Sequence, residues 1–122
     1  MIRHVVLLKW KPGTTTEAID YWVDGVVQLP DKINVVRRYT IGRNVGTSKE
    51  GMAKESIFSD NFDAAVTADF DTYADYQIYA EHPEHKSFIE ERVRPILLER
   101  VGAQFDLDEI PRYTPREPVI QR

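Results

Sequence analysis

The chain has 122 residues, of which 42% are hydrophobic and 30% charged, and its formal net charge is −4. This length fits one small globular domain, and a negative charge without a clustered basic face argues against a nucleic-acid surface. The absence of cysteine excludes disulfides, thiolate metal ligands and cysteine nucleophiles. The apolar stretch at the N-terminus is too short for a signal core or a membrane span, so we expect a cytoplasmic protein with no membrane partner.

The first predicted element is a strand over residues 2–10, which is rich in β-branched and aliphatic side chains and stops at Lys11-Pro12-Gly13. Alternation along this strand divides its side chains between two faces. The first face carries His4, Val6, Leu8 and Trp10. The opposite face is also largely apolar, so we expect the strand to be covered on both sides.

A helix is predicted next, because Thr14 and Glu17 have the spacing of a capping box. Its apolar stripe at helical spacing consists of Ile19, Trp22, Val23, Val26 and Val27. Leu29-Pro30-Asp31 ends the helix. Gly25 weakens it, which suggests that another element approaches closely at this position.

Two further strands are predicted over residues 33–45 and 62–70. In the second of them, one face carries Phe62, Ala64, Val66, Ala68 and Phe70. Between these strands, residues 46–61 are polar, contain glycine and lack periodicity, which predicts a long surface loop.

The last part of the domain is predicted to be helical and then extended. A helix starts at Asp71-Thr72, is interrupted at His82-Pro83 and ends near Pro95. Its apolar positions are Tyr73, Tyr76, Tyr79, Ala80, Phe88, Ile89, Val93, Ile96 and Leu97. Residues 101–107 alternate as a fourth strand. We expect the domain to span residues 1–107 and residues 108–122 to form an extended tail that crosses onto a partner subunit or covers the mouth of a pocket.

The order β-α-β-β-α-β predicts an α+β fold of the ferredoxin-like type, with helices on one face of a four-stranded antiparallel sheet. The face without helices is expected to be apolar and to carry Val6, Leu8, Trp10, Val66, Phe70 and Phe105. An exposed apolar face of this size is typical of an interface. We therefore expect a homodimer in which two sheets pack face to face and enclose a cavity.

Four segments resemble successive signatures of the stress-responsive A/B barrel (Dabb) family. They are residues 2–11 (IRHVVLLKWK), 41–45 (IGRNV), 64–71 (AAVTADFD) and 79–85 (YAEHPEH). The resemblance covers residues 2–107, and its most specific part is the combination of the opening histidine strand, the His-Pro-x-His turn and the closing strand. The resemblance implies a homodimeric α/β barrel of the ferredoxin-like class.

The resemblance also implies a candidate catalytic site. A plant polyketide cyclase of this family works without a cofactor inside the barrel, and its catalytic positions correspond here to His4, Tyr79 and His85. A further histidine of that enzyme corresponds to Ala64, so this chain departs from it there. Small side chains at Ala64 and Ala68 would leave space for a ligand.

Each candidate residue also has a simpler interpretation. His4 fits a hydrogen-bonded structural histidine as well as an acid/base in an apolar environment. His82 and His85 are three residues apart, which suits a helix-breaking turn, a capping His82 with His85 in a pocket, or a metal pair that needs a third ligand. Tyr79 belongs to a stripe that is typical of a core, although a phenol there can polarise a substrate carbonyl.

Other motifs carry no site. Residues 42–49 lack the order of a phosphate-binding loop. Asp69 and Asp71 share a strand face that points away from the expected cavity.

Three functions remain open from the sequence. The first is a cofactor-independent cyclase, lyase or isomerase, with His4 as the acid/base and with His85 and Tyr79 orienting an apolar or aromatic carbonyl compound. The second is a non-catalytic dimer that is a plain interface or a passive binder of a hydrophobic ligand. The third is a role in haem handling or monooxygenation, which other barrels of this fold perform. No cofactor and no metal ion are expected for the first.

Overall fold

The computed structural model describes residues 1–45 and 61–108 and has the α+β order that the sequence predicts. Its elements in chain order are β1 (Ile2–Trp10), α1 (Thr16–Val26), α2 (Leu29–Lys32), β2 (Arg38–Arg43), β3 (Ala64–Phe70), α3 (Tyr73–Glu81), α4 (Pro83–Phe88), the π-helix η2 (Ile89–Val93) and β4 (Leu97–Asp106). All but one residue of the predicted loop at 46–61, and the tail after Asp108, lie outside the described residues.

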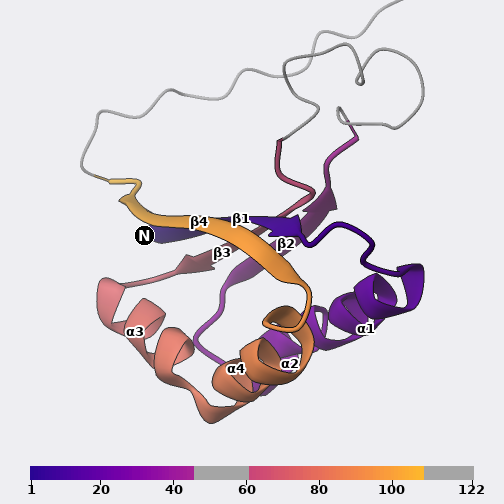
Figure 1. Ribbon diagram of the computed structural model, residues 1–122. Helices are drawn as coiled ribbons and strands as arrows, with labels where there is room; N and C mark the ends of the chain where they lie inside the picture. Colours follow the sequence, from indigo (N-terminus) through magenta and orange to yellow (C-terminus); the bar gives the residue numbers. More distant parts are fainter. Residues whose placement is uncertain (46–60, 109–122) are drawn as a thin grey trace, which may run out of the picture.

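The four strands form one antiparallel sheet in the order β2-β3-β1-β4. This is the ferredoxin-like arrangement, in which the first and third strands are central. The helices lie together on one side of the sheet, and β4 forms one of its edges (Figure 1). Within residues 1–45 and 61–108, no helix is long and apolar enough to cross a membrane.

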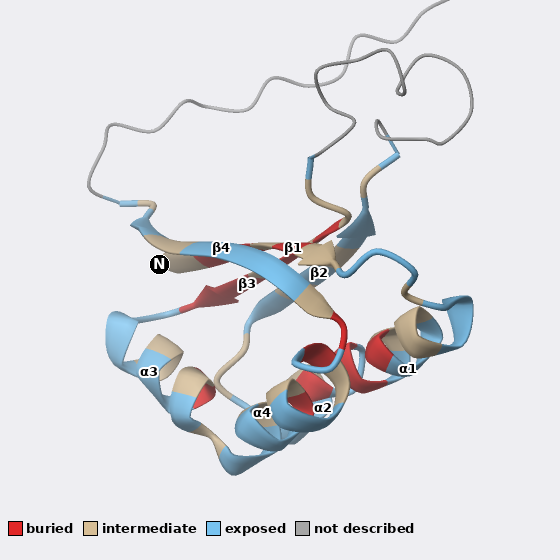
Figure 2. Cartoon of the chain, viewed as in Figure 1, coloured by how far each residue is buried: buried red, intermediate tan, exposed pale blue. Residues whose placement is uncertain are grey.

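The core lies between the helices and the sheet, where buried residues gather (Figure 2). On the sheet side it consists of Val6, Leu8, Ala64, Val66, Ala68 and Phe70. The helices contribute Trp22, Val26, Leu29, Tyr79, Phe88 and Val93. This layer is the single hydrophobic core that a chain of this length can support.

The prediction of which sheet face the helices cover was wrong for most residues. Val6, Leu8, Val66 and Phe70 are instead buried beneath the helices. Of the side chains expected on the uncovered face, only Phe105 lies there, opposite Arg3 of β1 and 53% exposed. Trp10 also packs against the core. Because both alternating sets of β1 are apolar, the period of two could not decide which set faces the helices.

The uncovered face is nonetheless partly apolar. Val5 and Leu7 of β1 lie opposite Ala103 and Val101 of β4, and Val101 is 49% exposed. Arg3 crosses this face to Asp69, where its Nε and Nη2 donate to the two carboxylate oxygens at 2.8 and 2.9 Å. The ion pair lowers the pKa of Asp69 and accounts for a buried carboxylate on an otherwise open face.

The first helix begins one residue later than predicted. Thr15 is its N-cap, and its hydroxyl accepts a hydrogen bond from the Ala18 N–H at 3.1 Å. The Thr14 hydroxyl instead donates to the Lys11 carbonyl at 2.6 Å. Three consecutive threonines offer three caps of equal propensity, so the sequence could not choose between them.

Gly25 of α1 lies where another element approaches closely, as predicted. It is buried against the segment that contains Phe88 and Arg92. A methyl group at this position would lie 2.9 Å from the Phe88 ring and closer still to the Arg92 side chain. Glycine therefore lets α1 and the second helical region meet.

Two strands have different bounds from those predicted. β2 begins at Arg38 instead of residue 33, because the chain first forms the short helix α2, whose C-cap is the buried Ile33. β4 begins at Leu97, which the sequence predicts as an apolar position of the preceding helix. Proline at position 95 ends the helical segment earlier than apolar spacing alone suggests.

The second helical region is divided into three parts. Thr72 caps α3, and His82 caps α4 by accepting the Glu84 N–H on Nδ1 at 3.1 Å. The helix then widens into the π-helix η2, where the Arg94 N–H donates to the Ile89 carbonyl at 2.9 Å. Such π-turns are frequent at functional sites, and this one lies beside the cavity described next.

Candidate active site

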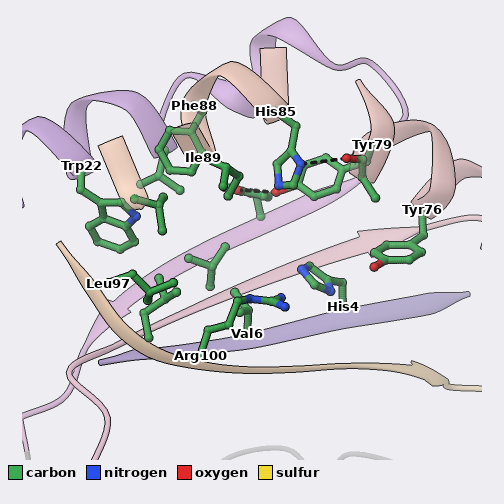
Figure 3. Close-up of a pocket in the computed structure, with 16 residues that line it drawn as sticks. His4, Val6, Trp22, Tyr76, Tyr79, His85, Phe88, Ile89, Leu97 and Arg100 are labelled. Carbon is green, nitrogen blue, oxygen red and sulfur yellow. Dashed lines mark hydrogen bonds between the residues drawn. The ribbon is translucent and has the colours of Figure 1, made fainter. Parts of the chain in front are cut away.

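An apolar cavity of about 290 Å³ lies between the sheet and the helices of the single chain. Its lining residues are His4, Val6, Leu8, Trp22, Val26, Tyr39, Val66, Tyr76, Tyr79, Ala80, His85, Phe88, Ile89, Val93, Leu97 and Arg100 (Figure 3). The cavity expected between two packed sheets belongs to a dimer and stays a prediction, because the structure holds one chain. The three predicted site residues, His4, Tyr79 and His85, all line this cavity.

His4 projects from β1 into the cavity, and only 6% of the residue is exposed. Its Nδ1 lies 2.7 Å from Oε1 of Gln104, which is the residue directly opposite on β4. With an amide oxygen as the acceptor, Nδ1 carries the proton and Nε2 keeps its lone pair. Burial lowers the pKa of His4, partly offset by the Gln104 hydrogen bond, so the ring is a neutral base near pH 7.

His85 lies in the first turns of α4, and its Nδ1 is 3.1 Å from the Ala80 carbonyl. A carbonyl can only accept, so this contact fixes the proton on Nδ1 and leaves Nε2 basic. Burial is the main cause that lowers the pKa of His85. The hydrogen bond with the Ala80 carbonyl partly offsets this effect, and the neighbouring His4, Arg100 and His82 side chains lower the pKa further. The site thus holds two neutral imidazoles of the same tautomer.

The Tyr79 ring packs near both histidine rings. Its ring centroid lies 4.4 Å from that of His85 and 6.1 Å from that of His4. Its hydroxyl is 2.9 Å from the hydroxyl of Tyr39, on β2. In such a pair one hydroxyl donates a hydrogen bond to the other, and the accepting hydroxyl can still donate a hydrogen bond to a ligand.

Both phenols remain protonated over the physiological range. Burial raises the pKa of Tyr39 to about 12 and raises that of Tyr79 further, with the neighbouring Tyr39 adding to the effect. Tyr76 completes the aromatic group, with its ring 5.2 Å from His4. The tyrosines therefore supply neutral hydrogen-bond donors rather than bases.

Sequence reasoning missed several residues of the site. Tyr39, Gln104 and Arg100 come from β2 and β4, and no local spacing relates them to His4 or Tyr79. Trp22 had been assigned to the core, yet its Nε1–H is buried with no hydrogen-bond partner in the described part of the chain. A buried donor without a partner on a cavity wall is a feature that a ligand acceptor would satisfy.

The remaining candidates lie outside the cavity. His82 caps α4, as one of its interpretations predicted. Asp69 binds Arg3 on the uncovered face, and Asp71 accepts from Arg37 at 2.9 Å. No group of three potential metal ligands occurs within residues 1–45 and 61–108, so His82 and His85 have no third ligand there.

Of the two small residues expected to leave space, neither lines the cavity with His4. Ala64 lines a second cavity of about 420 Å³, together with Trp10, Trp22 and Arg43. Ala68 is fully buried and lies opposite His4 in the β1–β3 register. Its methyl group therefore packs beside the imidazole without opening room for a ligand.

The fold and the site define a class: ferredoxin-like α+β proteins with an apolar cavity between helices and sheet. Comparison with family models agrees, since residues 2–107 match the Stress responsive A/B Barrel Domain. The chain belongs to this family, as the motifs of residues 2–85 predicted. A comparison with curated proteins found no match.

Solved structures with this fold include enzymes and proteins without an assigned activity. A dimeric ferredoxin-like protein of unknown function from Thermobifida fusca is 28% identical, with a TM-score of 0.70 over 87% of this chain and 90% of that one. The hydroxynitrile lyase of Passiflora edulis is 20% identical, with a TM-score of 0.73 over 91% and 96%. An antibiotic biosynthesis monooxygenase is 13% identical, with a TM-score of 0.63 over 91% and 100%. The last two likenesses show the shared fold alone.

Proposed function

We propose that this chain is a cofactor-independent small-molecule enzyme of the lyase, cyclase or isomerase kind. The observation that carries the proposal is the pair of neutral imidazoles, the buried His4 and the half-buried His85, each with Nδ1 engaged and Nε2 left basic. Acid–base catalysis needs such a group, held in orientation and poised near the working pH. The apolar walls favour an aromatic or aliphatic carbonyl compound.

In the proposed reaction, Nε2 of His4 takes a proton from the substrate, either from a carbon next to a carbonyl or from a hydroxyl. Negative charge then develops on a substrate oxygen. This oxygen accepts a hydrogen bond from the hydroxyl of the Tyr39–Tyr79 pair whose hydrogen is not already donated. His85 accepts a hydrogen bond from a second substrate group and so orients it. The imidazolium of His4 returns its proton to the product, which balances the step without a cofactor.

The functional unit is proposed to be a homodimer. The uncovered sheet face exposes Val101 and Phe105, and several relatives of this fold are dimeric. Burying that face against a second copy would remove apolar surface that a monomer leaves in water. The tail after Leu107 is proposed to cross onto the partner subunit or to cover the mouth of the pocket. The expected cytoplasmic location is tested by cell fractionation.

Turnover is the direct test. The purified protein is screened against β-polyketones, phenolic ketones and hydroxynitriles, the last because a hydroxynitrile lyase shares the fold. We expect His4→Ala to lower kcat by about 100-fold or more. The matched control is His82→Asn, which removes an imidazole outside the cavity and keeps a good N-cap. No turnover of any substrate, with ligand binding unchanged in His4→Ala, would contradict the proposal.

Passive ligand binding is the second candidate, and the predominantly apolar lining favours it. It predicts that a hydrophobic ligand co-purifies and that the histidine variants still bind it. Native mass spectrometry of the purified protein, compared with the denatured mass, detects such a ligand and reports the oligomeric state in the same measurement. A haem or monooxygenase role rests on fold analogy alone, and a colourless purified protein that does not take up haem would remove it.

A further inference from the structure

The cavity carries one permanent cation, Arg100, which the acid–base proposal does not use. Arg100 lies on β4 opposite Leu8, so it shares the helix-facing side of the sheet with Gln104, the partner of His4. Its guanidinium extends along the cavity in the direction of His4 (Figure 3). The charge therefore stands at the edge of the same space that the two imidazoles line.

A glycine makes this position possible. A Cβ at Gly102 would lie 2.5 Å from Nη2 of Arg100 and 3.2 Å from its Cζ. Real Cβ atoms do not approach other atoms that closely, so any larger residue at position 102 would displace the guanidinium. The absent side chain at Gly102 lets Arg100 lie flat over the strand and reach the cavity.

Arg100 has no carboxylate partner of its own in the described part of the chain. By contrast, Arg3, Arg37 and Arg94 each form an ion pair. Among the described residues that line the cavity, none is aspartate or glutamate. The charge of Arg100 acts on the site, because it lowers the pKa of both His4 and His85.

An apolar cavity with an unpaired guanidinium at its edge complements a molecule with an apolar body and one anionic group. Guanidinium binds carboxylate through two parallel N–H···O bonds, which a neutral amide cannot reproduce. We propose that Arg100 is the specificity-determining residue of the cavity and binds the carboxylate of an aromatic or aliphatic acid. This inference rests on the ligand cavity of the proposed function and narrows its substrate class.

The test uses matched pairs of acids and amides: benzoate with benzamide, cinnamate with cinnamamide, and 2-naphthoate with 2-naphthamide. Binding to the full chain is measured by calorimetry at pH 8, where both imidazoles are neutral and Arg100 is the cation of the cavity. We expect the acid of the best-fitting pair to bind about tenfold more tightly than its amide. Arg100→Gln should remove this preference while the amide's Kd stays unchanged.

Two variants control for charge and folding. Arg94→Gln removes one positive charge from a surface ion pair and should leave the preference intact. Arg100→Lys keeps the positive charge but cannot form the two parallel hydrogen bonds of a guanidinium, so it should retain part of the preference for the acid. Because the amide reports on the cavity itself, unchanged amide binding shows that Arg100→Gln is folded.

The outcomes separate the two proposals. If the amide binds and the acid binds no more tightly, the carboxylate site is overturned and the acid–base proposal still stands. The same holds if Arg100→Gln weakens the binding of acid and amide equally. A preference that depends on Arg100, without turnover of any carboxylate-bearing ketone, would support the site and count against the enzyme. If none of the six compounds binds, both the carboxylate site and the ligand cavity are overturned.

Discussion

At the scale of single residues, the site is a group of neutral acids and bases whose states are set by burial. The Nδ1 contacts of His4 and His85 fix their tautomers, and the raised pKa values keep Tyr39 and Tyr79 protonated. Each side chain alone has an ordinary structural interpretation. Together they place two basic nitrogens and a free hydroxyl hydrogen on one small cavity.

The hydrogen bond between Tyr39 and Tyr79 is expected to stabilise the fold. Either Tyr→Phe variant leaves the other, partly buried hydroxyl without its partner, so each should lower the free energy of unfolding by about 1–2 kcal/mol. The double variant removes both hydroxyls and should lose less than the sum. A double-mutant cycle by urea unfolding measures this coupling, and additive losses would mean that the two hydroxyls do not interact.

The two cavity histidines, His4 and His85, should make stability depend on pH. Their pKa values are lowered from 6.5 in the folded chain, so the unfolded chain binds more protons in the interval below 6.5. Their contribution to stability is therefore complete above pH 6.5 and falls as the pH drops through the lowered values. Unfolding free energies measured from pH 8 to pH 5 should show this decline.

The controls for that decline are histidine variants. The double variant His4→Gln/His85→Gln should show a shallower slope between pH 6.5 and pH 5. His82→Asn, which removes only the smallest of the causes that lower the pKa of His85, should keep most of the slope of the natural chain. Asp69, whose pKa is lowered by Arg3, loses its contribution only in more acidic solution, as the pH falls below 3.8. An unchanged slope in the double variant would show that other groups carry the dependence.

At the scale of elements, the cavity depends on how α1 meets the second helical region. Trp22 and Val26 of α1 and Phe88 of α4 line it, and Gly25 allows their backbones to approach. The π-helix η2 adds Ile89 and Val93 to the same wall. A change in this contact is therefore expected to alter both stability and the shape of the cavity.

Gly25→Ala tests the close approach of the helices. The new methyl group would meet the Phe88 ring and the Arg92 side chain, and overpacking of this kind costs about 1–3 kcal/mol. Alanine recovers up to about 1 kcal/mol of helix propensity, so we expect a net loss of about 1 kcal/mol in urea unfolding. At Gly42, where nothing lies within 4 Å of an added methyl, alanine serves as the control without a clash. Stabilisation by Gly25→Ala would mean that the helices separate at little cost.

At the scale of the whole molecule, the sheet has one face in the core and one face open. The open face combines apolar residues of β1 and β4 with the Arg3–Asp69 ion pair. This composition suits the non-obligate as well as the permanent interfaces of proteins. The cavity lies on the opposite side of the sheet, within one chain, so dimer formation and ligand binding can be altered separately.

The expected homodimer is tested by charge on the open face. Phe105→Glu places a carboxylate where two sheets would meet and should shift the protein to monomer in sedimentation or light-scattering measurements. Ile78→Glu changes an apolar residue of α3 that is 51% exposed and should leave the assembly unchanged. A natural chain that is monomeric, or a dimer that Phe105→Glu leaves intact, would contradict the proposed interface.

The resemblance to the family supplied the three candidate residues His4, Tyr79 and His85. The sequence by itself determined the α+β class and the order of the four strands and the two main helical regions. Local patterns suffice for these features, because strand alternation, helix caps and the His-Pro turn are properties of neighbouring residues. Several element boundaries were shifted, as at Thr15, Arg38 and Leu97, where the local signals offered equal alternatives or overlapped.

Tertiary structure alone decided which face of the sheet the helices cover and what surrounds the candidate residues. β1 is apolar on both faces, so the choice depends on how the connections between strands cross the sheet, a property of the whole chain. The partners of the site come from far along the sequence: Tyr39 is 40 residues from Tyr79, and Gln104 is 100 residues from His4. Sheet register brings such residues together, and no local spacing encodes it.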